Sequence, residues 1–161
     1  MFLFYSCVME SALLPHSVAL SSRVSLELFS GKRPSHRRLN SLLPQNLSRF
    51  NTVMLPVLQS HHWYLVVLEK EFNGFVGYCL DSLNCDRSAN RSAIERCLVS
   101  QKIVQWVSVE CSQQNNSVDC GVFLISFLEV LAKSPTLELQ RVKTLDINNQ
   151  RTHLASLRHA S

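Results

Sequence analysis

Hydrophobic and polar positions form a clear pattern only from residue 51 onward. Thr52–Leu58 is a short apolar run that contains Pro56, and we expect an edge strand here because proline cannot donate a hydrogen bond within a sheet. Residues 63–68 are aromatic and β-branched, which predicts a buried strand. The pair Asn73-Gly74 is typical of a hairpin turn, so Phe75–Leu80 is predicted to be the returning strand.

A helix and a further strand are predicted next. After a polar loop over Asp81–Asn90, apolar residues at helical spacing predict a helix over Ser92–Lys102, capped by Ser88 or Asn90. Alternation over Ile103–Val109 predicts a strand. Its two faces would carry Ile103, Gln105, Val107 and Val109 on one side and Val104 and Trp106 on the other.

The C-terminal part of the pattern is helical. Val118–Ala132 is too long an apolar run for a strand, so it predicts a buried helix, which Ser134-Pro135 would end. The polar stretch Ser112–Ser117 before it is predicted to be a loop. A last amphipathic segment begins near Asp146 and carries Ile147, Leu154 and Leu157.

The first fifty residues are poorly patterned. Ser17–Phe29 is compatible with either a helix or a strand, and Gly31, Pro34 and Pro44 indicate loops. We therefore divide the chain into a basic N-terminal region, residues 1–50, and a patterned domain, residues 51–161. Clustered strands with helices between and after them predict an α+β fold.

Composition narrows the class of protein. A chain of 161 residues with 46% apolar and 17% charged residues can form one globular domain, and it has no apolar run of the ~20 residues that span a membrane. Its six cysteines lack zinc-ligand spacing, so we expect no metal site. We also expect no cofactor. No secretory signal is evident, which favours a reducing compartment, the nucleus or cytoplasm, although residues 11–50 also have a transit-peptide composition.

The net charge of +4 comes entirely from residues 1–60, which carry six basic and two acidic residues. Most of that excess lies in residues 32–38, Lys-Arg-Pro-Ser-His-Arg-Arg. Such a cluster occurs in nuclear-import and polyanion-binding patches, but we favour a solvated loop around Gly31 and Pro34. A nucleic-acid-binding protein normally carries more basic surface, so we expect no nucleic-acid partner and no membrane partner.

Four residues form a candidate catalytic set. Cys120 stands between a polar loop and an apolar helix. At this position, the N-terminus of the helix, the helix dipole favours the thiolate. His62 opens a strand and could act as general base, while Asp81, at the end of the next strand, could fix its tautomer. Gln114 could donate an amide hydrogen to the oxyanion of a tetrahedral intermediate.

The spacing of the hairpin is not ideal for this set. From the Asn73-Gly74 turn the arms run eleven residues back to His62 and seven residues on to Asp81, so we expect a bulge or a longer turn. The competing residues have weaker positions. These are His61, expected on the opposite strand face; Asp86, in a loop; Cys111, before the loop; and Asp119, which we interpret as structuring the loop.

The order and context of these residues resemble the Ulp/SENP family of ubiquitin-like-protein cysteine proteases. His62-Trp63 opens a strand, Asp81-Ser82 ends the next, and Gln114 stands six residues before Cys120-Gly121, with Asp119 just ahead. The block at residues 113–123 is the most specific part of the match.

The resemblance implies a papain-like cysteine protease fold with a central mixed sheet, flanking helices and a nucleophile at a helix N-terminus. It implies that His62, Asp81, Gln114 and Cys120 are catalytic, and that Trp63 packs over the Gly-Gly tail of the substrate. The expected activity is cleavage after that tail in a ubiquitin-like modifier. SUMO is the first expectation, NEDD8 and ubiquitin are alternatives, and we expect the enzyme to be a monomer.

The resemblance covers about residues 50–160. The family's N-terminal Trp-Leu…Asp motif has no match in residues 1–50, and Trp63 is the first tryptophan, so we expect an N-terminally incomplete domain. Asp146-Ile147 with Arg151 and Leu154 loosely resembles the family's closing helix. Two other hypotheses stay open: a non-catalytic remnant that binds a modifier, and a His-Asp-Cys acetyltransferase or viral-type protease.

Overall fold

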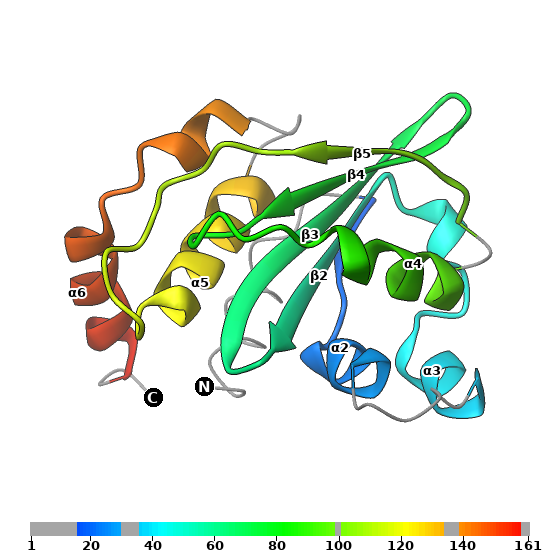
Figure 1. Ribbon diagram of the computed structural model, residues 1–161, viewed down its shortest axis with the longest axis horizontal. Coiled ribbons are helices and arrows are strands. Elements are labelled where there is room, and N and C mark those ends of the chain that lie inside the picture. The colour runs from blue at the N-terminus through cyan, green and yellow to red at the C-terminus, as the bar shows by residue number, and fades with distance from the viewer. Residues whose placement is uncertain (1–15, 30–35, 99–100, 134–138, 159–161) are drawn as a thin grey trace.

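One five-stranded sheet forms the centre of the computed structural model, which describes residues 16–29, 36–98, 101–133 and 139–158 (Figure 1). The strand order is β1-β2-β3-β4-β5. The strands are β1 (Ser17–Ala19), β2 (Thr52–Gln59), β3 (His62–Glu71), β4 (Gly74–Leu80) and β5 (Ile103–Ser108). The two inner pairings are antiparallel, whereas β1 and β5 run parallel to their neighbours, so the sheet is mixed.

Helices cover both faces of this sheet. Those on one face are α2 (Ser22–Leu28), α3 (His36–Leu42) and α4 (Ser88–Cys97). On the other face lies α5 (Cys120–Ala132), with α6 (Ile147–Arg158) packed against it (Figure 1). Two 3₁₀ turns, η1 (Leu47–Arg49) and η2 (Leu139–Lys143), complete the order. The predicted α+β class with flanking helices is confirmed.

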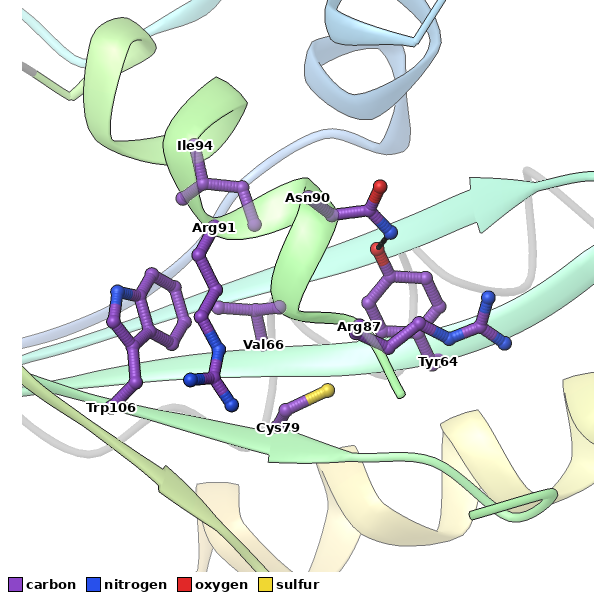
Figure 2. Close-up of a pocket in the computed structure, with 8 residues that line it drawn as sticks. All are labelled: Tyr64, Val66, Cys79, Arg87, Asn90, Arg91, Ile94 and Trp106. Atoms are coloured by element: carbon purple, nitrogen blue, oxygen red, sulfur yellow. Dashed lines mark hydrogen bonds between the residues drawn. The ribbon is translucent and has the colours of Figure 1, made fainter. Parts of the chain in front are cut away.

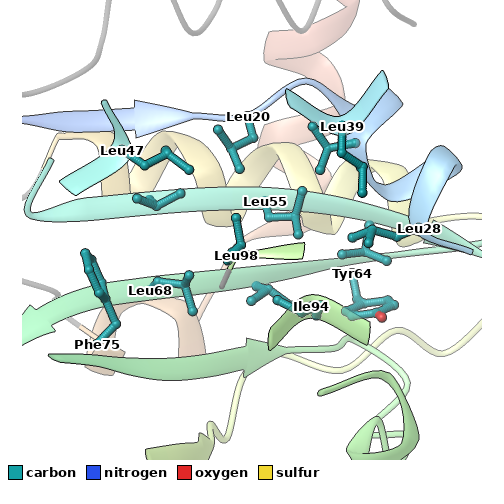
Figure 3. Close-up of a cluster of buried hydrophobic side chains, with 14 residues drawn as sticks. Leu20, Leu28, Leu39, Leu47, Leu55, Tyr64, Leu68, Phe75, Ile94 and Leu98 are labelled. Carbon is teal, nitrogen blue, oxygen red and sulfur yellow. The ribbon is translucent and has the colours of Figure 1, made fainter. Parts of the chain in front are cut away.

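Side-chain alternation on the two central strands divides the core into two clusters. Tyr64, Val66 and Leu68 of β3 face the first cluster, together with residues of α2, α3 and α4 (Figure 3). Leu65 and Val67 face the second, which α5 fills with two phenylalanines and three leucines. Because helices bury both faces, β3 is a continuous apolar run rather than an alternating one.

β2 is not the edge strand that its proline predicted, since β1 lies outside it. Pairing with β1 stops at Met54, whose carbonyl accepts from Leu20 N–H, and the next donor on that side, Leu58 N–H, bonds to Ser25 Oγ of α2. Alternate residues of a strand point to the same side, so Pro56 faces the gap between these contacts. Its missing N–H is therefore needed by no neighbouring strand.

The β3–β4 hairpin turns one residue earlier than predicted. Glu71 pairs with Gly74, so Phe72 and Asn73 form the two-residue loop and Gly74 begins β4. Gly74 has a φ of +144°, and a Cβ there would come within 2.3 Å of the Lys102 carbonyl oxygen. The position therefore requires glycine.

A bulge disturbs the predicted faces of β5. Phe75 pairs with Ile103, but the next residue of β4, Val76, pairs with Gln105, so Val104 is extra. As a result Ile103 and Trp106, which alternation placed on opposite faces, both pack against the first cluster.

Helix α4 begins earlier than the predicted Ser92. Neither proposed cap closes it, because Ser88 and Asn90 both lie inside the helix. Asp86 instead accepts hydrogen bonds from the backbone N–H and the hydroxyl of Ser88. Ser17–Phe29, which was compatible with a helix or a strand, contains one of each: β1 is followed by α2, which Ser21 caps.

The remaining predictions meet the structure as follows. The buried helix is present as α5, two residues shorter at its start, and the last amphipathic segment forms α6. Ile147 of α6 packs against the second cluster, whereas the side chains of Leu154 and Leu157 lie outside the described part. Residues 32–35 of the basic cluster also lie outside it, and residues 36–38 begin α3, where a loop was expected.

Within the described residues, no helix has the length and apolarity to cross a membrane. The five described cysteines are free thiols: Cys79, Cys85, Cys97, Cys111 and Cys120.

Gly77 gives a test of the packing between β4 and β5. It lies opposite Trp106, and an added Cβ would come within 2.6 Å of the indole ring. Gly77→Ala is expected to lower the free energy of unfolding by about 1–3 kcal/mol, because the ring must shift. Urea denaturation measures this. With Trp106→Leu in the same chain the added methyl gains room, so the two losses should be less than additive. Full additivity would contradict this packing.

Candidate active site

The β3–β4 hairpin brings His62 and Asp81 together. His62 Nε2 lies 2.6 Å from Asp81 Oδ1, and both side chains are buried. The register is regular up to Leu65 opposite Leu80, so the expected bulge is absent. Continued pairing would set Asp81 opposite Tyr64, and His62 reaches the carboxylate from two residues further along the same strand face. The unequal arms of the hairpin are thus bridged diagonally by side chains.

Asp81 is held by three donors. Its Oδ1 accepts from His62 and, at 2.9 Å, from the backbone N–H of Leu83. Its Oδ2 accepts from Arg87 Nε at 2.6 Å. Charge-assisted bonds of this kind are the strong ones in proteins, so the carboxylate has one fixed orientation.

The Arg87 side chain is itself fixed by a chain of contacts. Its guanidinium lies 4.7 Å from the centre of the Tyr64 ring. The Tyr64 hydroxyl accepts a hydrogen bond from Asn90 of α4, as Figure 2 shows, and Asn90 exchanges two amide hydrogen bonds with Gln59 of β2. The start of α4 therefore supports the Asp81 carboxylate from behind.

A small pocket lies on the α4 side of the sheet beside these contacts. Figure 2 shows its lining, which comprises Tyr64, Val66, Cys79, Arg87, Asn90, Arg91, Ile94 and Trp106. None of the four predicted catalytic residues lines it.

The hydrogen bond to Asp81 assigns the tautomer of His62. A carboxylate only accepts, so Nε2 must carry the hydrogen that it donates. In the neutral ring the other nitrogen, Nδ1, is then an unprotonated acceptor. His62 can take a proton from a group that approaches Nδ1.

Cys120 is the first residue of α5, as the loop-to-helix pattern predicted. Among the described residues, the backbone N–H groups of Cys120 and Gly121 have no hydrogen-bond acceptor, because the first bonds at this end run from Val122 and Phe123 to the Asp119 carbonyl. These two donors and the helix dipole create a site that favours negative charge at the start of α5.

Three other described cysteines are poor nucleophiles. Burial raises the pKa of Cys79 to about 12 and that of Cys97 and Cys111 to about 11, so these remain thiols at neutral pH. Cys111 also donates to the Asp81 carbonyl at 3.4 Å. This hydrogen bond joins the segment after β5 to the end of β4.

The loop before α5 is tied to the end of β4. Gln113 Nε2 donates to the Asp81 carbonyl, and the backbone N–H of Gln114 donates to the Ser82 carbonyl at 2.8 Å. Gln114 Oε1 accepts from Ser82 Oγ, while its Nε2 donates one hydrogen to the Asn116 carbonyl. One amide hydrogen of Gln114 is left for another acceptor.

These contacts place the candidate residues at one end of the sheet, where the loop bonded to Asp81-Ser82 leads directly into Cys120. No hydrogen bond joins Cys120 Sγ and His62 within the described part of the chain. Trp63 is half-buried and packs against the second cluster, the one that α5 completes.

Two of the competitors, His61 and Asp86, lie away from these contacts. His61 is exposed and forms the β2–β3 turn with Ser60, both at positive φ, rather than lying on a strand face as expected. Among the described residues, the Asp86 side chain accepts hydrogen bonds only from Ser88, at the start of α4.

Sequence reasoning missed Arg87 entirely. It lies in a stretch predicted to be a polar loop, and nothing in its spacing connects it to Asp81. Arg151 appeared only as part of the loosely matched closing helix, although it forms a two-oxygen ion pair with Asp119, the residue before Cys120. Charge complementarity between the segments around residues 119 and 151 was the one available signal.

Comparison with known proteins decides the family. Residues 27–159 match the Ulp1 protease family, C-terminal catalytic domain. The chain belongs to the Ulp1 family. The match extends upstream of the motifs, into α2 and α3, and the resemblance inferred from the motifs is confirmed.

Solved structures share the Ulp1-type fold. A de-sumoylating protease aligns with a TM-score of 0.75 at 19% identity, over 98% of this chain and 74% of that one. The SUMO protease Ulp1 with its catalytic cysteine oxidised to a sulfenic acid gives 0.69 at 17% identity, over 97% and 73%. The C-terminal Ulp1 protease domain in complex with Smt3, the yeast ortholog of SUMO, gives 0.61 at 15% identity, over 93% and 75%. No curated protein sequence matches the chain significantly.

Membership of the Ulp1 family makes the chain a cysteine protease. The fold accounts for the placement of Cys120 at the start of α5 and of His62 and Asp81 on adjacent strands.

Proposed function

We propose that the chain cleaves peptide or isopeptide bonds after the Gly-Gly tail of a ubiquitin-like modifier, with SUMO as the first candidate. The observation that carries the proposal is the buried His62–Asp81 hydrogen bond at the end of the sheet where α5 begins with Cys120. Membership of the Ulp1 family and the fold shared with a Ulp1–Smt3 complex support the choice of modifier.

In the first step His62 acts as the general base. Its Nδ1 takes the proton of the Cys120 thiol, and Asp81 stabilises the resulting imidazolium through Nε2. The thiolate attacks the carbonyl carbon of the terminal glycine and forms a tetrahedral intermediate. The backbone N–H of Cys120 and the remaining amide hydrogen of Gln114 then donate to its oxyanion.

Collapse of the intermediate breaks the C–N bond. The leaving amine takes the proton from His62, and the modifier remains attached to Cys120 as a thioester. Water, deprotonated by His62, then attacks the thioester and releases the modifier carboxylate and the free thiol. No step requires a metal or a cofactor.

Trp63 would bind the tail of the modifier in this proposal. It follows His62 directly in β3 and is half-buried, so part of its ring is accessible at this end of the strand. Glycines suit such a position, because a backbone without side chains can lie flat against an aromatic ring.

Modifier probes test the proposal. SUMO, NEDD8 and ubiquitin that carry a C-terminal vinyl sulfone or propargyl group should be incubated with the protein and the adduct located by mass spectrometry. We expect covalent labelling of Cys120 by the SUMO probe and none in Cys120→Ser. The fastest probe identifies the modifier.

Two outcomes would contradict the proposal. If no probe labels the protein while SUMO still binds, the chain is a modifier-binding protein without catalysis. If no probe labels it and none of the three modifiers binds, the assignment to modifier cleavage is wrong.

A further inference from the structure

An ion pair connects the last helix to the residue before the nucleophile. Arg151 of α6 donates to both carboxylate oxygens of Asp119, and Asn116 also donates to one of them, Oδ2, at 2.6 Å. Both oxygens of Asp119 are therefore engaged by partners outside α5. The Asp119 side chain is one-tenth exposed, whereas that of Arg151 is about half exposed.

This arrangement departs from the ordinary role of an aspartate at a helix start. Asp119 is the N-cap of α5, where a carboxylate commonly accepts from the N–H groups of the first turn. Here the side chain makes no such bond. Arg151 and Asn116 hold the carboxylate instead. The N–H groups of Cys120 and Gly121 are therefore free to stabilise a different negative charge, such as a thiolate or an oxyanion.

The charge of Asp119 works against a thiolate in the next residue. Its hydrogen bonds from Arg151 first and from Asn116 second hold the pKa of the Asp119 carboxyl below its ordinary value, so it is ionised at neutral pH. An unpaired carboxylate next to a thiol disfavours the second negative charge. The paired arginine offsets that effect.

Other contacts keep α6 in this position. Gln150 donates to Glu129 on α5, and His153 lies 3.7 Å from the same carboxylate. Ile147 packs into the second cluster, which contains the buried face of α5. Contacts of α6 on both sides of Arg151 in the sequence, at Ile147 and Gln150 before it and at His153 after it, thus hold Arg151 next to Asp119.

The ionisable groups on the elements around the start of α5 could each influence the Cys120 thiol. They are Asp119 in the preceding loop, Glu129 on α5, Arg151 and His153 on α6, His62 on β3, Asp81 and Arg87 after β4, and Cys111 after β5. Glu129 is held by Gln150, Asp81 is paired with Arg87, and Glu110 pairs with Lys143 at the surface. Asp119 is the one carboxylate adjacent to the nucleophile in the chain, and Arg151 is its charged partner.

We propose that Arg151 is a positioning residue for the nucleophile: it holds the Asp119 carboxylate and offsets its charge, so that α6 must be docked for Cys120 to ionise readily. The inference rests on the proposed function, because it assigns Arg151 a part in the same thiol chemistry. It also makes the docking of the C-terminal helix a condition for a reactive site.

A thiolate titration tests this without substrate. The ultraviolet absorbance of the thiolate is followed against pH, and the signal of Cys120→Ser in each background is subtracted to isolate Cys120. In Arg151→Met the midpoint should rise by about one pH unit, which lowers the thiolate fraction about tenfold at a fixed pH below it. In Asp119→Asn it should fall below the wild-type midpoint, because a lone cation remains.

The double variant Asp119→Asn/Arg151→Met separates charge from structure. It loses the same contact with α6 as Arg151→Met but has no unpaired carboxylate, so its midpoint should return close to the wild-type one. Arg151→Lys, which keeps the charge with poorer geometry, should lie between the wild type and Arg151→Met.

The order of midpoints decides the outcome. If the double variant titrates as high as Arg151→Met, the effect is structural and the proposal is wrong. If Arg151→Met does not fold, Asp119→Asn still decides, because an unchanged or raised midpoint in that variant would overturn the proposal. If the midpoints follow the expected order but no modifier probe labels the protein, the proposed function is wrong and the role of Arg151 still holds.

Discussion

Cys120→Ala is expected to lower kcat for cleavage of a SUMO precursor by about 10⁴- to 10⁶-fold, because the covalent route is lost with its nucleophile. The residual rate would come from binding and from the oxyanion donors alone. A gel assay of precursor cleavage under single-turnover conditions measures the rate. The variant should still fold, since Cys120, although buried, occupies only the first position of α5, and the phenylalanines and leucines that pack into the second cluster are unchanged.

Cys85→Ser is the matched control. Cys85 is exposed in the loop after β4, and its thiol donates a long hydrogen bond to the Leu83 carbonyl, at 3.8 Å. Its replacement should leave the rate within about twofold of the wild type, as is usual for an exposed position. A comparable loss in both variants, or cleavage that survives without Cys120, would show that another group is the nucleophile.

Asp81→Asn is expected to reduce kcat/KM by about 10³- to 10⁴-fold with little change in the fold. Asp81 has two acceptor oxygens, one for His62 and Leu83 and one for Arg87. An amide has only one. The charged donor Arg87 forms the stronger bond and takes it, so the amide NH₂ is turned toward His62.

That orientation gives His62 the wrong tautomer. An NH₂ group donates, so Nε2 must become the acceptor and the hydrogen moves to Nδ1, the nitrogen that should receive the thiol proton. The imidazolium also loses its carboxylate partner. Both effects lower the rate without any change in the position of the ring.

Asp86→Asn controls for the loss of an acidic residue in the same loop. The Asp86 side chain accepts hydrogen bonds from the backbone N–H and the hydroxyl of Ser88, and those bonds hold the pKa of its carboxyl below the ordinary value. This variant should retain full activity and lose some stability at the start of α4. Equal activity in Asp81→Asn and the wild type would remove Asp81 from the catalytic set.

Most of the position of the candidate site could be predicted from the sequence, because the candidate residues belong to short local patterns. β3 and α5 are each a long apolar run bounded by polar residues, β4 follows a turn dipeptide, and the candidate residues stand at the ends of these segments. Local pattern thus predicted that His62 and Asp81 come from adjacent strands and that Cys120 begins a helix. Their residue roles stay predictions until the variants are measured.

Features set by tertiary contacts could not be predicted in this way. Pro56 indicated an edge strand because proline cannot donate to a neighbouring strand. In the structure β1 pairs with only the first three residues of β2, and no local pattern shows this. The unequal lengths of the hairpin arms indicated a bulge. The register is regular, however, because the His62 side chain is long enough to reach Asp81 diagonally across the two strands. Arg87 depends on α4 packing over Tyr64, a contact between segments more than twenty residues apart.

The partial coverage of β2 also bears on how this sheet avoids pairing with other chains. An open strand edge is a template for aggregation, and proteins protect such edges with short strands, prolines and bulges. In the described sheet β1 has only three residues, Pro56 removes a donor where β1 has ended, and β5, the opposite edge, is interrupted by a bulge at Val104. The two sides are therefore protected by different means, and the sheet is poorly suited to growth by strand addition.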